Sequence, residues 1–190
     1  MSELLLDTSG PLTQDDFSIF QLPRQFTLDV KELELRWKAL QKQVHPDKFS
    51  MAGPAAQRLA MQWSSRVNEA YRRLKTPLAR ATYLCELMGA PIQAESNTSM
   101  PTHFLMEQME LREHLDEAQS AEDFKKLASL VQESISQRQA MCVKWFEEEG
   151  SPKPQEASQE VRAWMFMDKF LQDIQRRAAS LSEGQVSSPN

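Results

Sequence analysis

Pro46 is the residue that most constrains the fold, because it separates two stretches of helical hydrophobic spacing. Apolar residues precede it at intervals of four, three and four: Leu33, Trp37, Leu40 and Val44. Residues at these intervals share one side of a helix. Proline has no backbone N–H and disfavours helical geometry in the residue before it, so this helix should end near Val44. His45 and Asp47 should therefore lie on a turn.

A second helix should follow this turn and pack against the first. Its apolar residues repeat at intervals of four, four, three and four: Leu59, Trp63, Val67, Ala70 and Leu74. At the start of the first helix, Asp29 can act as the N-cap, with Glu32 at the third position. Two helices with complementary apolar sides and a short connection should form an antiparallel helical hairpin.

The first helix of the hairpin carries lysines on the side opposite its apolar residues. Lys31, Lys38 and Lys42 are seven and four residues apart, and Lys48 lies just beyond the turn. A helical hairpin with His-Pro-Asp in its connection and a basic outer side resembles the J-domain, which stimulates ATP hydrolysis by DnaK-class chaperones. The resemblance implies that six residues contact the chaperone: Lys38, Lys42, His45, Pro46, Asp47 and Lys48.

Composition favours helices over sheets and argues against a nucleic-acid partner. Five Gly and two Tyr stand against ten Met, and we find no convincing alternating strand pattern. A length of 190 residues permits one large or two small domains. The formal net charge of −5 does not suit a surface that binds DNA or RNA, although the lysine row, by which we mean Lys31, Lys38 and Lys42, is a local exception.

The sequence predicts a cytoplasmic protein without a membrane, metal or cofactor site. The N-terminal segment is acidic and its apolar run is only three residues long, which suits neither an export signal nor a membrane span of about 20 residues. Cys85 and Cys142 form no CxxC or CxxH pattern. We expect both cysteines to be buried as small apolar residues.

The order of helical and turn-rich stretches predicts two all-helical domains. A short turn of helix from Asp15 to Phe20 should pack on the hairpin, and a helix from Pro77 to Met88, which Gly89 ends, should connect the domains. The expected segments are an N-terminal extension (1–13), a J-domain with the connecting helix (14–88), a linker loop (89–100), a C-terminal three-helix bundle (101–184) and a tail (185–190).

The expected bundle contains three long helices with short connections. They should span Pro101 to Ala118, a stretch that starts after Ser120 in a capping-box pattern and runs to about Glu149, and about Glu156 to Leu181. The expected core side chains of the second helix are Phe124, Leu127, Val131, Ile135, Cys142 and Trp145. Those of the third are Met167, Leu171, Ile174, Ala178 and Leu181.

The first bundle helix carries two apolar stripes where packing needs one. Phe104, Leu111 and Leu115 form the expected core stripe. A second stripe lies roughly 100–200° around the helix and mixes apolar with acidic residues: Leu105, Met106, Met109, Glu110, Glu113 and Glu117. Either the bundle buries both stripes, or the methionines are scattered on the surface, or the second stripe binds a partner with an apolar patch rimmed by Lys or Arg.

The stretch from Phe104 to Glu117 narrows the resemblance to the HscB family of J-domain co-chaperones. With the J-domain, the similarity extends from about residue 15 to residue 181. In that family the C-terminal bundle binds the iron–sulfur scaffold protein IscU. By position, the resemblance implies scaffold contacts at Leu105, Met106, Met109, Glu110, Glu113, Glu117 and Phe166. Phe166 lies off the expected core stripe of its own helix, which agrees with this role.

The sequence therefore predicts a co-chaperone rather than an enzyme. We expect it to stimulate an HscA-type chaperone of the DnaK class and to deliver IscU to it. One alternative is a general J-domain co-chaperone that serves DnaK with another client. Another is a hydrolase with His45 as base and Asp47 to orient it, but the sequence offers no third catalytic group, phosphate loop or metal cluster to complete such a site.

Overall fold

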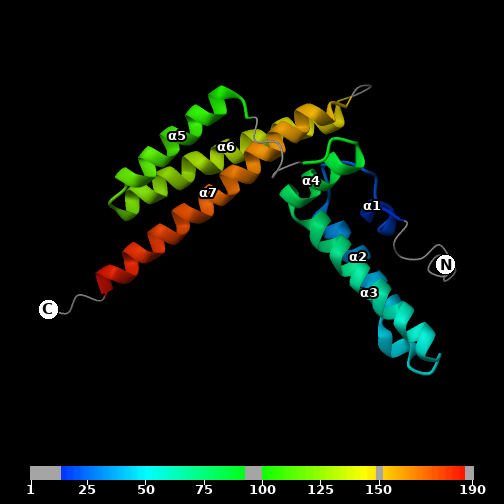
Figure 1. The fold of residues 1–190 in the computed structure, drawn as a ribbon. Coiled ribbons are helices and arrows are strands. Elements are labelled where there is room, and N and C mark those ends of the chain that lie inside the picture. The colour runs from blue at the N-terminus through cyan, green and yellow to red at the C-terminus, as the bar shows by residue number, and fades with distance from the viewer. Residues whose placement is uncertain (1–13, 93–99, 149–151, 187–190) are drawn as a thin grey trace. The chain divides into compact units, whose positions relative to one another are not determined.

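The fold is helical throughout the part of the chain that the structure describes. The structure is a computed structural model that describes residues 14–92, 100–148 and 152–186, and side chains as far as Leu181. These residues form seven α-helices and one short 3-10 helix, with no strand among them (Figure 1). The expected all-α fold is confirmed. The expectations for residues 1–13, for most of the loop at 89–100 and for the last four residues lie outside the described residues.

The hairpin consists of α2 (Val30–Val44), the 3-10 helix η1 (Pro46–Phe49) and α3 (Pro54–Lys75). Asp29 caps α2, since its side chain accepts hydrogen bonds from the backbone N–H groups of Lys31 at 2.8 Å and of Glu32 at 3.3 Å. The helix ends at Val44, directly before the His-Pro-Asp turn. The cap and the end predicted from the sequence are both confirmed.

Packing of α2 against α3 is antiparallel. Trp37 donates a hydrogen bond from Nε1 to Asn68 Oδ1 at 3.0 Å and stacks on Tyr71 with 4.4 Å between ring centroids. One turn further along α2, Gln41 donates to the backbone carbonyl of Ser64 at 3.5 Å. Residue numbers thus rise along α2 as they fall along α3, which is the expected hairpin.

Two short helices complete this part of the chain. In α1 (Asp16–Ile19), Asp15 is the N-cap and accepts from the N–H groups of Phe17 and Ser18 at 3.0 and 3.1 Å. Phe17 is fully buried, as its place in the sequence suggested. Helix α4 (Pro77–Leu87) ends before Gly89, whose φ of +76° is readily adopted only by glycine.

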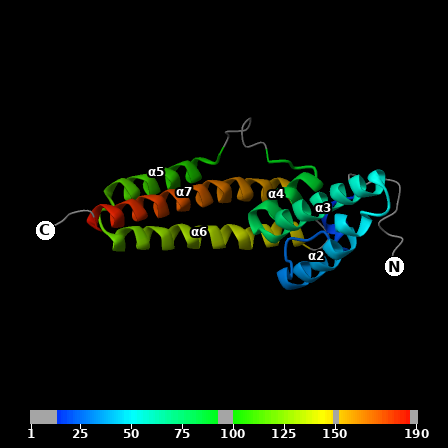
Figure 2. The same cartoon turned by 90° about the horizontal axis from the view of Figure 1, so that it is seen from below.

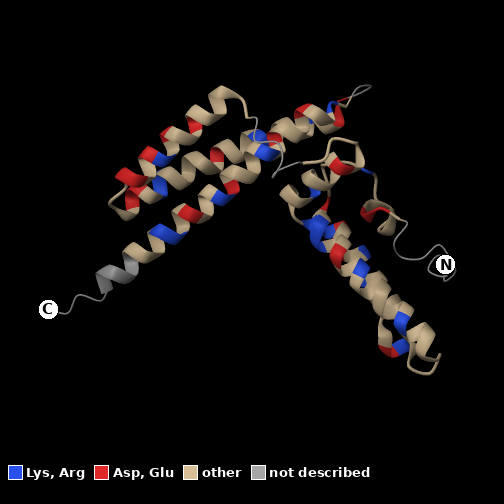
Figure 3. Cartoon of the chain, viewed as in Figure 1, with Lys and Arg blue, Asp and Glu red and all other residues tan. Residues whose placement is uncertain are grey.

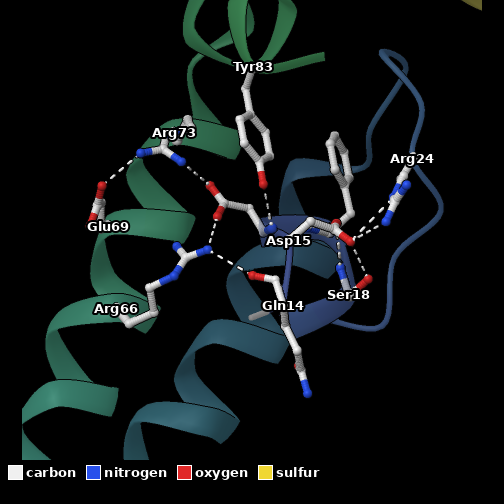
Figure 4. A network of polar contacts seen from close by, with 10 residues as sticks. Gln14, Asp15, Ser18, Arg24, Arg66, Glu69, Arg73 and Tyr83 are labelled. Carbon is white, nitrogen blue, oxygen red and sulfur yellow. Dashed lines mark hydrogen bonds and ion pairs between the residues drawn. The ribbon is translucent and has the colours of Figure 1, made fainter. Parts of the chain in front are cut away.

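Asp16 forms a buried charge cluster that the sequence analysis missed. Its side chain is fully buried and lies between two arginines of α3: Arg66 forms an ion pair with Oδ1, without hydrogen-bond geometry, and Arg73 donates to Oδ2 at 3.1 Å. The backbone N–H of Asp16 donates to Tyr83 Oη of α4 at 3.0 Å. Figure 4 shows Arg66, Arg73 and Tyr83 converging on the start of α1. The cluster joins α1 to α3 and α4.

The chain divides into two compact units within α4, between Leu84 and Cys85. The second unit contains α5 (Thr102–Glu117), α6 (Ala121–Glu147) and α7 (Pro154–Val186), which lie side by side in Figures 1 and 2. Ser120 and Asp123 form a reciprocal capping box at the start of α6. Arg138 of α6 binds Glu107 of α5 at 2.7 Å and Glu160 of α7 at 3.2 Å. The three-helix bundle is confirmed.

Two expected core positions are wrong by one residue. Ala60 is buried in α3 where Leu59 was expected, and Leu59 is 38% exposed. In α6, Phe146 is buried, while Trp145 is only partly covered and has the ammonium groups of Lys144 and Lys153 over its ring. Positions three and four residues along a helix both return to the same side, so spacing alone did not choose between these neighbours.

The remaining expected core positions differ in how far they are covered. Val67, Ala70, Leu74, Val131, Cys142, Met167 and Ile174 are among the most deeply buried residues. Trp37 and Leu40 in α2, and Leu171, Ala178 and Leu181 in α7, are only partly buried. The partly covered residues of α7 lie in its C-terminal half, beyond the buried Met167. None of the described helices is long and apolar enough to cross a membrane.

Candidate interaction surfaces

The His-Pro-Asp turn is built by the backbone and leaves its polar side chains exposed. His45 leaves the helix with φ −61° and ψ 125°, and Pro46 starts the 3-10 helix. The turn closes through a hydrogen bond from Lys48 N–H to the His45 carbonyl at 3.1 Å. The side chains of His45 and Asp47 are 54% and 90% exposed. Neither side chain is needed to fill the core, so both are available to a partner.

His45 and Asp47 make only a weak contact with each other. Nδ1 of His45 lies 3.4 Å from the Asp47 backbone nitrogen and 3.5 Å from Asp47 Oδ2. The first contact needs a ring that accepts at Nδ1, whereas the second needs a ring that carries a proton on Nδ1 and donates there, so the two contacts exclude each other. The Asp47 carboxylate is almost fully solvated, so its contact with the ring contributes little.

The predicted lysine row lies on one exposed side of α2. Lys31, Lys38 and Lys42 are all exposed, and an open hollow beyond them is lined by Gln41, Lys42, His45 and Lys48. Lys38 is paired with Glu34 at 2.6 Å. The hydrogen bond and charge of Glu34 raise the pKa of Lys38, and those of Lys38 lower the pKa of Glu34. Lys42 has no ion pair within the described residues, so its charge is not offset in this way.

The second stripe of α5 is exposed, whereas the first is buried. Phe104, Leu111 and Leu115 are at most 9% exposed, but Leu105, Met106 and Met109 are 46%, 58% and 63% exposed. Glu110, Glu113 and Glu117 are exposed too, and Figure 3 shows acidic residues along α5. The alternative that the bundle buries both stripes is therefore excluded. We call these six exposed residues the apolar–acidic face of α5.

Phe166 differs from the other six residues assigned to the scaffold. It is partly buried on α7, meets the ring of Phe104 edge-on at 5.7 Å and stacks on Phe170 at 6.1 Å. Such aromatic pairs stabilise a core beyond the area that they bury. Phe166 thus takes part in the packing of the bundle. Truncating it would lower the stability of the bundle as well as weaken any contact with a partner.

The described residues offer no metal cluster and no reactive thiol. No group of three His, Cys, Asp or Glu residues gathers in residues 14–92, 100–148 and 152–186. Cys85 and Cys142 are buried and unbridged, as expected, and burial raises the pKa of each thiol to about 12. Thiols at such a pKa are poor nucleophiles.

Comparison with known proteins agrees with the geometry of both units. Residues 100–175 match the family model described as the HSCB C-terminal oligomerisation domain. The "Co-chaperone protein HscB homolog" of Bordetella petrii is 45% identical over 161 residues, covering 84% of this chain and 94% of that protein. The homologue of the same name from Burkholderia thailandensis is 43% identical over 163 residues, covering 86% and 93%.

Solved structures show the same fold over most of the chain. The crystal structure of human co-chaperone protein HscB matches with a TM-score of 0.81 and 30% identity, over 87% of this chain and 83% of that one. Chaperone HscB from Vibrio cholerae matches with a TM-score of 0.75 and 31% identity, over 88% and 99%. The helical hairpin with its His-Pro-Asp turn is therefore a J-domain, and the chain belongs to the HscB family of co-chaperones.

Proposed function

We propose that this co-chaperone acts in the cytoplasm, where it stimulates ATP hydrolysis by an HscA-type chaperone of the DnaK class and delivers the scaffold IscU to it. Iron–sulfur cluster assembly and transfer would depend on this delivery. One observation carries the proposal: each of the two compact units has its own exposed surface, and the two surfaces differ in chemistry.

The chaperone-binding surface would be the turn with the lysines nearest to it. Its residues are His45, Pro46 and Asp47 with Lys38, Lys42 and Lys48. The turn is held by its backbone, so its exposed imidazole and carboxylate are positioned before a partner arrives. The lysines would steer an acidic surface of the chaperone toward the turn, which affects the association rate above all.

The scaffold-binding surface would be the apolar–acidic face of α5, together with Phe166 of α7. Exposed Met and Leu side chains adapt to a partner surface, and the surrounding carboxylates favour a partner patch rimmed by Lys or Arg. Phe166 would contribute less directly, because it also packs on Phe104.

Joining the two surfaces on one chain explains how such a protein acts without a catalytic group. A scaffold held by one unit is kept near a chaperone held by the other, which raises its effective concentration without any new contact. ATP would be hydrolysed by the chaperone, and the present chain would supply binding energy alone.

The test measures the ATPase rate of a purified HscA-type chaperone with increasing co-chaperone, with and without IscU. Wild-type protein should stimulate the rate, and His45→Gln should abolish stimulation but still bind IscU with unchanged affinity. His103→Gln is the matched control, since it changes an exposed histidine of α5 in the same way. Full stimulation by His45→Gln would overturn the proposal.

The same assay distinguishes the proposed function from the alternative of a general J-domain co-chaperone. A protein that serves DnaK with another client should stimulate a general DnaK at least as well as the HscA-type chaperone. It should also show no measurable complex with IscU in calorimetry. Both results together would replace the proposed function with that alternative.

A further inference from the structure

Leu35 is an exposed leucine whose place on α2 is not explained by the fold. Its relative exposure is 68%, whereas Leu33, two residues earlier, is fully buried. Two residues correspond to about 200° around a helix, so Leu35 lies on the side that faces away from α3. A lone exposed leucine is ordinary on a protein surface. What distinguishes Leu35 is the set of charged side chains around it.

Leu35 lies in the middle of the lysine row. Lys31 precedes it by four residues and Lys38 follows it by three, and both spacings bring side chains together on one side of a helix. Lys42 is a further turn along the same side. The ion pair with Glu34 at 2.6 Å restrains Lys38 beside the leucine. The result is one exposed apolar side chain flanked along the helix by Lys31 and Lys38.

We propose that Leu35 is the apolar anchor of the chaperone-binding surface and enters an apolar pocket of the chaperone that is rimmed by carboxylates. This inference rests on the proposed function, because it deepens the role of the same surface. An apolar centre with a charged rim is the usual anatomy of a contact that holds a partner, since the rim excludes water from the centre. The rim of lysines determines the charge of the partner's pocket.

The distance along α2 fits a single partner that covers both Leu35 and the turn. Ten residues separate Leu35 from His45. At about 1.5 Å per residue, this is a separation of about 15 Å along the helix. The hollow lined by Gln41, Lys42, His45 and Lys48 occupies the intervening side of α2 near the turn. An interface of ordinary size spans this length.

The structure makes Leu35 suitable for a clean test. Because its side chain is exposed, truncation opens no cavity, and alanine favours the helix at least as well as leucine. Leu130 of α6 is the matched control, since it is a leucine of the other unit with 54% exposure. Leu35→Met retains an apolar side chain of similar size, so it should retain function.

The experiment titrates the full-length protein into a purified HscA-type chaperone and measures the concentration that gives half-maximal ATPase stimulation. Leu35→Ala should raise this concentration roughly tenfold, the size expected for loss of a central contact. Leu35→Met and Leu130→Ala should match the wild type. Raising the ionic strength should raise the half-maximal concentration of wild type and of Leu35→Ala by the same factor, because the lost contact is apolar and the lysine charges remain.

The outcomes separate this inference from the function on which it rests. If His45→Gln abolishes stimulation while Leu35→Ala matches the wild type, the anchor is wrong and the chaperone-binding role of the turn stands. If Leu35→Ala and Leu130→Ala are impaired equally, the effect is not specific to the lysine row and the anchor is also wrong. Full stimulation by His45→Gln would overturn the proposed function and the anchor with it.

Discussion

Phe104 and Leu105 are consecutive residues of α5 that lie on different sides of the helix. Phe104 is 1% exposed and sits beneath the guanidinium of Arg138, which is 4.8 Å from the centre of its ring, whereas Leu105 is 46% exposed. One residue corresponds to about 100° of rotation around a helix. Substitutions at the two positions should therefore separate the stability of the bundle from its binding to a partner.

We first predict that Leu105→Ala combined with Met109→Ala weakens binding of IscU and leaves the fold intact. Truncation of central contact residues costs about 1–3 kcal/mol of binding free energy, which corresponds to roughly 5–150-fold in affinity. Stimulation of the chaperone without the scaffold should not change, because the turn lies in the other unit. Calorimetry with IscU and the scaffold-free ATPase assay measure the two effects.

Phe104→Ala is the control for this pair. It removes a buried ring and should lower the free energy of unfolding by roughly 3–5 kcal/mol. Urea unfolding followed by circular dichroism measures the loss. An equal loss of stability in the Leu105/Met109 double variant would contradict the separation of the two sides of α5.

The second prediction concerns the lysine row and is sharpened by the Lys38–Glu34 ion pair. Charge reversal of both Lys38 and Lys42 should weaken chaperone binding, and added salt should weaken the wild-type complex, because exposed charges act through a screened field. Lys42→Glu alone is the cleaner single variant, since Lys38→Glu also leaves Glu34 without its ion-pair partner. The ATPase titration at several salt concentrations measures both. Binding that does not depend on salt would show that the lysines are merely solvated.

The ends of the helices were predictable from the sequence because local chemistry determines them. Asp29 caps α2, the His45–Pro46 pair ends it, and Ser120 with Asp123 starts α6, all as expected. Each of these features depends on residues within about four positions in the chain. The division of α5 into one buried and one exposed side was also predictable, since the helical period places the two stripes of residues on different sides.

Features that depend on distant residues could not be predicted in the same way. The buried ion pairs of Asp16 could not be predicted because its partners Arg66 and Arg73 are 50 and 57 residues away in the sequence. Phe166 was expected to lie off the core stripe of its helix, yet it packs on the buried ring of Phe104 in another helix. The binding roles of the turn and of α5 remain predictions, because they depend on molecules outside this chain.

The third prediction is a dependence of stability on pH through the capping box of α6. Hydrogen bonds from the Ser120 side chain and from the backbone N–H groups of Ser120 and Gln119 lower the pKa of Asp123 below its ordinary value of 3.8. A carboxylate with a lowered pKa stabilises the folded state above the ordinary pKa, and this contribution is lost as the pH falls through the lowered value. Asp123→Asn should therefore melt at a lower temperature than wild type at pH 7.

The difference between wild type and Asp123→Asn should shrink as the pH falls below about 4, because protonation then removes the same charge from the wild type. Melting temperatures from pH 7 to pH 2.5 measure this convergence. Glu122→Gln, a neighbouring substitution in the first turn of α6, is the control. A difference that stays constant over this range would show that the charge of Asp123 does not stabilise the cap.

The last prediction is that Asp16→Ala strongly destabilises the J-domain unit. Asp16 is fully buried, and its removal leaves Arg66 and Arg73, which are 14% and 33% exposed, without their shared carboxylate. Breaking a buried ion pair by removing one partner typically costs 3–5 kcal/mol. We expect about 3 kcal/mol, because both guanidinium groups retain some contact with water. Tyr83→Phe should cost about 1 kcal/mol, since it removes only the acceptor of the Asp16 N–H.

Glu69→Ala is the matched control for the Asp16 substitution, because Glu69 also binds Arg73, at 2.7 Å, but its side chain is 54% exposed. An exposed pair of this kind contributes at most about 1 kcal/mol. Urea unfolding of the full-length protein, followed by the fluorescence of Trp37 and Trp63 in variants with Trp145 and Trp164 replaced by Phe, reports on the unit that contains Asp16. If Asp16→Ala lowered the unfolding free energy no more than Glu69→Ala does, the buried carboxylate would not be what holds α1 against α3.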